Sequence, residues 1–253
     1  MTRGILIVGN ESSLFNAVAA EAVKRVQSFA TAIIPSRFGA GDIESSGTES
    51  ADLRSVDPRS VDPRSADLKD GAVQLSWNPA SAISARTLVL AAENRLKKIN
   101  DAILVCSPPA VFKTPEALTP REIEILVDDH IKGWFFLIRE LILYFRNAGS
   151  GLLALVAPDI DTEAEAGKKN TAARNIQLDL LGPSAAASFR NYSQAVIASS
   201  ANEPYSVMGF TDSEAGSEEE FAAWFFKIVD EASPKNSGRW HKHSKRGFLG
   251  RLK

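Results

Sequence analysis

The sequence predicts an α/β protein: a single domain with a doubly wound parallel sheet and helices on both faces. Apolar runs typical of buried strands alternate with helical segments, and most connections between them are short. The chain has 253 residues, 44% hydrophobic and 24% charged, which is enough to close one sizeable core. Its formal net charge of −2 gives no general attraction to nucleic acid or to an anionic membrane.

A first βαβ unit is predicted at the N-terminus. Residues 4–9 are an apolar strand, residues 12–28 an alanine-rich helix, and residues 30–34 a second apolar strand. Four copies of a five-residue unit then occur within residues 38–70, where apolar residues are few. We expect a flexible insertion there, because the segment cannot bury enough surface to offset its ordering entropy. It is either a repeat that expanded in a tolerant loop or an arm that binds a partner.

The middle of the chain predicts two further strands and two helices. Residues 72–76 form a short strand, a helix follows over about 80–98, and an apolar strand within 100–107 ends at two prolines. A long helix over 119–147 begins with Thr119 as N-cap, followed by a proline and, three residues after the cap, a glutamate.

The last third repeats the alternation. We expect a strand over 151–158, a helix over about 183–200 and a strand over 205–210. A capping box at 217–220 predicts the start of the next helix, with three carboxylates at its positive end. These acidic residues therefore need no ligand to explain them.

The single cysteine, Cys106, lies inside an apolar strand, and we interpret it as a core residue of a protein in a reducing compartment. No signal peptide is recognised before the first strand. No uncharged apolar run reaches the roughly 18 residues needed to span a membrane. We therefore expect a cytoplasmic protein.

The turn after the first strand resembles the opening of the short-chain dehydrogenase/reductase family, whose loop reads T-G-x-x-x-G-x-G. With Gly9 on the first glycine, Ser13 falls on the second and Phe15 on the third. The resemblance implies a Rossmann-like fold and binding of NAD(P). Because the family's glycines let the backbone approach a pyrophosphate, we expect the Phe15 ring to occupy that space and cofactor binding to be lost.

The resemblance also implies a cofactor-selecting residue at the end of the second strand. Arg37 lies there and imitates an arginine that binds the 2′-phosphate of NADP. With the phosphate loop blocked, we favour a solvated loop arginine. We therefore expect no cofactor, and NAD(P) only if family chemistry survives with other residues.

The family's catalytic residues have no counterparts here. Family catalysis uses Tyr-x-x-x-Lys on one helix, so that the lysine lowers the tyrosine pKa. None of the three tyrosines has a lysine four residues later. The family's tyrosine and lysine positions fall on Leu181 and Ala185, and its serine position on Ala157 or the proline after it.

His130 lies at the position of the family's asparagine in the long helix, next to two aspartates. It could act as an acid–base group. Without a nucleophile or metal partner in the pattern, we favour a hydrogen-bonded structural histidine.

The second half of the long helix is apolar almost all round, so it must be covered on both sides. In the family this helix forms a subunit interface with the helix near 183–200, and we predict a homodimer or homotetramer through 119–147. The alternative is that the insertion or the tail covers the outer face. The expected interface residues are Trp134, Phe136, Leu137, Leu141 and Phe145.

The last thirteen residues, 241–253, carry five Lys or Arg and no acidic residue. We assign the domain to residues 1–240 and this segment to a basic tail that contributes little to folding. The tail is typical either of an attachment peptide for an acidic protein or anionic lipid, or of a solubilising terminus. Nucleic acid is a weaker candidate. His241 and His243 supply at most two metal ligands, and we predict no metal site.

Two hypotheses on function follow. The favoured one is a pseudoenzyme: a non-catalytic protein of the dehydrogenase/reductase type that acts as an oligomeric scaffold or binding module. The alternative is a divergent NAD(P)-dependent oxidoreductase with non-standard catalytic residues. A nucleotide sensor that binds without turnover is a third, weaker possibility.

Overall fold

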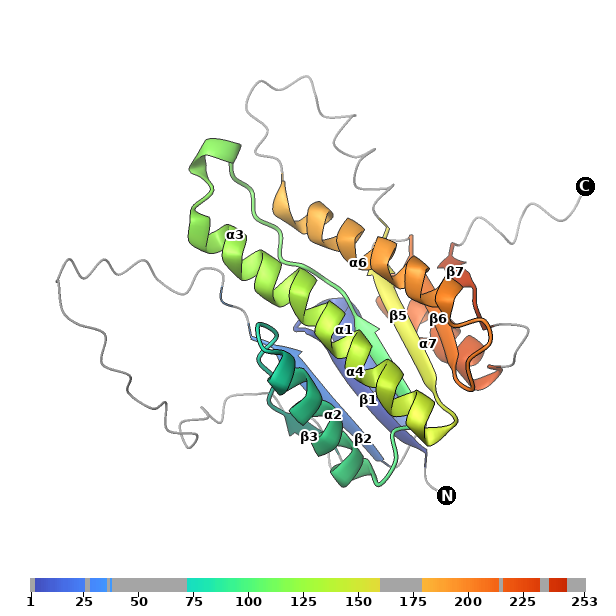
Figure 1. The fold of residues 1–253 in the computed structure, drawn as a ribbon. Helices are drawn as coiled ribbons and strands as arrows, with labels where there is room; N and C mark the ends of the chain where they lie inside the picture. The colour runs from blue at the N-terminus through green and yellow to red at the C-terminus, as the bar shows by residue number, and fades with distance from the viewer. Residues whose placement is uncertain are drawn as a thin grey trace, which may run out of the picture.

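The computed structural model describes residues 3–25, 28–35, 37, 72–159, 179–213, 216–232 and 237–244. The predicted insertion at 38–70 lies outside these residues. Within them, parallel strands form one sheet in the order β3-β2-β1-β4-β5-β6-β7 (Figure 1). The strands are β1 Gly4–Asn10, β2 Ser28–Ile34, β3 Ala72–Leu75, β4 Asp101–Val105, β5 Leu152–Pro158, β6 Ser206–Asp212 and β7 Trp240–His243.

Helices cover both faces of the sheet, which confirms the predicted Rossmann-like α/β fold. One core cluster joins the sheet to α2, α4 and α6, and a second joins the opposite face to α1 and α7 (Figure 1). The helices are α1 Ser13–Arg25, α2 Ala82–Leu96, α3 Pro120–Val127, α4 Gly133–Ala148, α6 Leu181–Ser199 and α7 Glu218–Asp230, with a 3-10 turn at Pro115–Ala117.

The central strands are buried on both faces, which explains their sequences. All residues of β4 are buried, and β1 and β5 are buried except at their last residue. A parallel strand covered on both sides needs a continuous apolar run rather than an alternating one. The chain order reverses between β1 and β4, so the crevice at their carboxyl ends is the place where ligands bind in folds of this kind.

The predicted long helix is present but interrupted. A π-helical segment, Asp128–Lys132, joins α3 to α4. Thr119 forms the predicted capping box: its side chain accepts a hydrogen bond from the Glu122 amide, and the Glu122 carboxylate accepts one from the Thr119 amide at 2.9 Å. Ser217 caps α7 without the side-chain hydrogen bond of a capping box, so that detail was wrong.

The boundary predicted between residues 240 and 241 falls inside a strand, because Trp240–His243 form β7 parallel to β6. The indole of Trp240 lies over Gly209, where an added β-carbon would be 2.1 Å from the ring, and its N–H donates to Thr211 at 2.9 Å. The first residues of the predicted tail therefore belong to the domain. A four-residue strand rich in basic and aromatic residues gives no clear strand pattern. The attachment role of the tail stays a prediction.

The predicted interface residues are mostly interior. Trp134, Leu137, Leu141 and Phe145 are completely buried within the single chain, since this side of α4 packs on the sheet. They have no surface left for a partner, and only Phe136 is partly exposed. The assignment of these four side chains to a subunit interface is therefore wrong. The prediction of an oligomer remains open.

Among the described helices none is both long and apolar enough to cross a membrane. The cytoplasmic location stays a prediction.

Candidate functional site

A pocket of about 360 Å³ lies at the carboxyl edge of the sheet, where the crevice between β1 and β4 is expected. We call it the edge pocket. It is lined by the turn after β1, the end of β2, the segment after β4 and the π-helical segment. The lining residues are Asn10, Glu11, Ser12, Ile33, Ile34, Pro35, Ser107, Pro108, Pro109 and His130.

The Asn10 side chain bridges the crevice between β1 and β4. Its amide nitrogen donates to the Ser107 carbonyl, and its carbonyl oxygen accepts from the Ser107 amide at 3.3 Å. A dinucleotide crosses a doubly wound sheet at this crevice. In this chain, the hydrogen bonds between Asn10 and Ser107 already span the crevice.

Phe15 does not fill the edge pocket, contrary to our expectation. Its side chain is only 2% exposed and belongs to the core between the sheet, α1 and α7. Its ring lies beneath Gly9, where an added β-carbon would be 2.6 Å from it. The turn passes over the Phe15 ring, and the ring does not enter the edge pocket. The pocket beside the turn therefore stays open.

The charges at the edge pocket do not fit a pyrophosphate. Glu11 is exposed at the start of α1, where the helix dipole would otherwise attract an anion. Ser12 already accepts a hydrogen bond from the Phe15 amide at 3.1 Å. Among the described residues that line the pocket, none is a lysine or arginine. Together with Ser13 at the position that the resemblance gives to a family glycine, these residues are a poor match for a pyrophosphate.

Arg37 is held by a buried carboxylate. Its Nε donates to Asp129 at 2.8 Å, a second guanidinium nitrogen forms a further ion pair with the same carboxylate, and Asp129 is 1% exposed. The hydrogen bond to Asp129 raises the pKa of Arg37, against the smaller effect of its desolvation. The side chain predicted as a solvated loop arginine is therefore engaged by the π-helical segment and does not line the pocket.

His130 lines the pocket from the π-helical segment and is 4% exposed. Burial lowers its pKa to about 4, although the Asp129 charge acts in the opposite direction. The imidazole is therefore neutral near neutral pH, and each ring nitrogen is either a donor or an acceptor. Such a group can orient a ligand but cannot supply positive charge for a phosphate.

The three residues that the resemblance puts at the family's catalytic positions are aliphatic, and that assignment stays a prediction. Ala157 is fully buried at the end of β5, and Leu181 and Ala185 lie in the first turns of α6. An aliphatic side chain can neither exchange a proton with a substrate oxygen nor lower the pKa of a neighbouring phenol.

Asp179 ties the start of α6 to the segment that follows β4. Its carboxylate accepts hydrogen bonds from the amides of Val111, Leu181 and Gly182 at 3.1, 3.2 and 3.0 Å. An added β-carbon on Gly182 would lie 3.2 Å from the Pro109 carbonyl. The segment after β4 and the start of α6 are thus packed directly against each other.

Sequence reasoning missed Asn10 and Asp179. Both act through hydrogen bonds to segments distant in the sequence, and no local pattern names those partners. The polar residue directly after Gly9 was the only signal for Asn10.

The two histidines near the C-terminus both contact side chains of β6. The His241 ring stacks on Phe210, and the Nδ1 atom of His243 lies 3.0 Å from the Asp212 carboxylate. In the described ranges no three potential ligands come together as a metal site.

No family model and no curated protein matches this chain. Solved structures do share its fold. One is an NADH-dependent reductase in complex with NAD, with 14% identity and a TM-score of 0.66 over 96% of this chain and 95% of that chain. Another is a mutant short-chain dehydrogenase/reductase from Serratia marcescens, with 9% identity and a TM-score of 0.64 over 95% of each chain.

Levodione reductase is also similar, with 11% identity and a TM-score of 0.65 over 95% of each chain. At these identities the likeness shows the fold alone: this chain has the fold of short-chain dehydrogenases/reductases.

Proposed function

We propose that this chain is a non-catalytic, degenerate relative of the short-chain dehydrogenases/reductases, acting as a self-associating scaffold or binding module. The observation that carries the proposal is that Ala157, Leu181 and Ala185, the residues that the resemblance puts at the family's catalytic positions, have no side chain able to exchange a proton. The packing of the segment after β4 against the start of α6 through Asp179 supports it, because it closes the space between these segments beside the predicted catalytic position Leu181.

The edge pocket then serves to bind a small molecule without turning it over. Apolar walls from Ile33, Ile34 and the three prolines suit a flat or aliphatic group, and Asn10 and His130 supply hydrogen bonds. Glu11 disfavours anions at the pocket's rim. We therefore propose an uncharged or cationic ligand rather than a nucleotide.

A divergent NAD(P)-dependent oxidoreductase is the second candidate. Two observations favour it: the edge pocket is open, and a structure of the same fold is an NADH-dependent reductase solved with NAD. The two candidates differ on both binding and turnover.

Calorimetric titration of the full chain with NAD(H) and NADP(H) separates them. We expect no saturable binding near millimolar concentration, and no oxidation of NADH or NADPH with a panel of ketones, aldehydes and enoyl thioesters. Saturable binding with turnover that Asn10→Ala or His130→Gln abolishes would establish the oxidoreductase instead.

A gain-of-binding variant sharpens this test. Glu11→Gln combined with Ser13→Gly removes the charge and restores a family glycine, and we expect it to raise affinity for NAD(H) at least several-fold. Glu219→Gln, at an exposed position in α7, is the matched control. If wild type binds NAD(H) as tightly as the double variant, the charge argument fails.

A further inference from the structure

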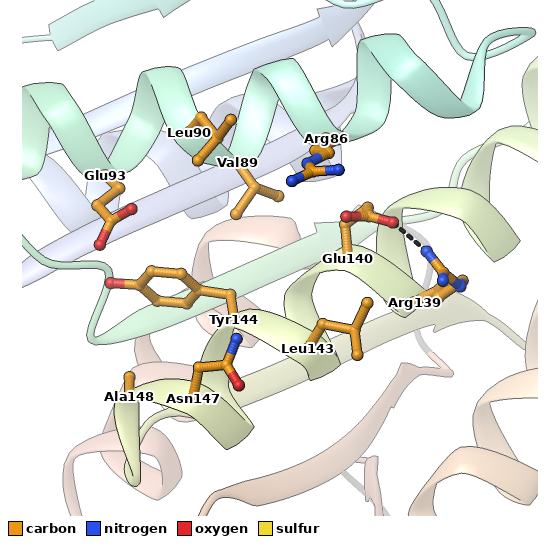
Figure 2. Close-up of a pocket in the computed structure, with 10 residues that line it drawn as sticks. All are labelled: Arg86, Val89, Leu90, Glu93, Arg139, Glu140, Leu143, Tyr144, Asn147 and Ala148. Carbon is orange, nitrogen blue, oxygen red and sulfur yellow. Dashed lines mark hydrogen bonds and ion pairs between the residues drawn. The ribbon is translucent and has the colours of Figure 1, made fainter.

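The outer surface of α4 is closed on one side and open on the other. Towards α6, the Phe135 ring stacks on Tyr192 with centroids 4.1 Å apart, so these two helices cover each other. Towards α2, a groove of about 530 Å³ separates the helices (Figure 2). We call it the α2/α4 groove. The seam between α4 and α6 is therefore closed, whereas the groove between α2 and α4 is open.

The groove is apolar along its middle. Leu90 of α2 is 49% exposed and Leu143 of α4 is 37% exposed, and both line it. Figure 2 shows Leu90 and Val89 on one wall, with Leu143 and Tyr144 on the other. The Tyr144 hydroxyl accepts a hydrogen bond from the Ile99 amide at 3.0 Å, which fixes this wall. Exposed leucines facing one groove are typical of a contact surface.

Two opposite charges on α2 flank Leu90. Arg86 precedes it by four residues and Glu93 follows it by three. At a rise of about 1.5 Å per residue they lie about 6 Å and about 4.5 Å from Leu90 along the helix axis. In the described part of the chain neither charge forms an ion pair, whereas Arg139 on α4 pairs with its neighbour Glu140 (Figure 2).

The pattern of charges on α2 is complementary to that of a second α2 helix that runs in the opposite direction. An antiparallel copy of α2 that crosses at Leu90 places Leu90 on Leu90 of the copy. It also places Arg86 opposite Glu93 of the copy, twice, on either side of the crossing. A two-fold axis requires such self-complementarity, since each subunit presents the same patch.

We propose that a second copy of this chain docks in the α2/α4 groove, with the two α2 helices antiparallel about Leu90. The proposal rests on the self-association in the proposed function and names its surface, which differs from the predicted interface between the long helix and α6. Leu143 of each subunit contacts the leucines of the crossing. The two Arg86–Glu93 pairs fix the direction of the helices.

The test is sedimentation equilibrium of the full chain with charge-reversed variants. Arg86→Glu and Glu93→Arg each replace two attractive pairs by repulsive ones, and each should weaken the dimer roughly tenfold. The double variant Arg86→Glu/Glu93→Arg restores opposite charges and should return to within about threefold of wild type. Mixing the two single variants should give a heterodimer, because both pairs are then attractive.

Matched controls separate the groove from general charge effects. Arg95→Glu changes an exposed charge on α2 that does not line the groove, and it should leave the dimer unchanged. Leu143→Glu should abolish the dimer. Ile123→Glu, at a 44% exposed apolar position of α3, should not. Circular dichroism checks that each variant folds.

Two results would overturn the proposal. A dimer indifferent to the groove variants but weakened by Tyr192→Ala places the interface at α6, and the scaffold function survives. A monomer at all accessible concentrations removes the interface and the self-association in the proposed function together. Its ligand-binding part is tested separately by the titration above.

Discussion

Replacing His130 by glutamine should remove a large part of the protein's loss of stability in weak acid. Burial lowers the pKa of this histidine to about 4, compared with about 6.5 in an unfolded chain. Between these values the unfolded state binds a proton that the folded state excludes. Stability is therefore complete above about pH 6.5 and falls as the pH decreases towards 4.

The magnitude follows from the two pKa values. From about pH 7.5 to about pH 5, linkage gives a loss of about 2 kcal/mol from His130 alone. For a domain of this size that is a decrease in the thermal midpoint of roughly 4–8 °C. The His130→Gln variant lacks this titration. Its free energy of unfolding should therefore fall by about 2 kcal/mol less than that of wild type over the same pH range.

The assay is urea unfolding of wild type and variant at several pH values, followed by circular dichroism. The informative quantity is the difference between the two curves, because the intrinsic cost of the substitution cancels from its pH dependence. His241→Gln, outside the edge pocket, serves as the control and should retain the wild-type acid loss. Parallel curves for wild type and His130→Gln would refute the assignment of a buried neutral imidazole.

Three further predictions concern local structure and are read by thermal or urea unfolding. Thr119→Ala removes the hydroxyl that caps α3 and should cost about 1 kcal/mol. Gly151→Ala should cost about 2 kcal/mol or more, because a β-carbon would lie 2.1 Å from an aromatic ring of α4; Gly149→Ala, with no neighbour within 4 Å, should cost less. Truncation before Trp240 should destabilise the domain by about 2 kcal/mol or more, whereas removal of 245–253 alone should change little. An equal effect of the two truncations would show that β7 adds nothing.

The edge pocket shows how far local patterns reach towards a site. The apolar strand ending at Gly9 predicted a crevice at the carboxyl edge of the sheet, and the edge pocket lies there. The pattern also showed that Phe15 stands at a position where the family has a glycine. It did not predict where the Phe15 ring packs. The ring packs below the turn because the core between α1 and α7 accepts it.

The interface residues show the opposite limit. The nearly uniform apolar sequence of α4 predicted that the helix is covered all round, yet Leu143 is 37% exposed in the single chain. Which side chains face the sheet and which face outward depends on the rotation of the helix about its own axis, and a nearly uniform apolar sequence does not encode that rotation. Only packing against the sheet put Trp134 and Leu137 inside and left Leu143 on the surface.

The sequence by itself determined the α/β class and the order of most elements, whereas the loss of the family's catalytic pair stays a prediction. These features depend on residue identity and on spacing along the chain. Tertiary structure alone decided that Arg37 is bound to Asp129, that Asn10 spans the crevice and that residues 240–243 form a strand. The reason is that each of these depends on partners between about 30 and 100 residues away, whose proximity is set by the sheet order and not by local pattern.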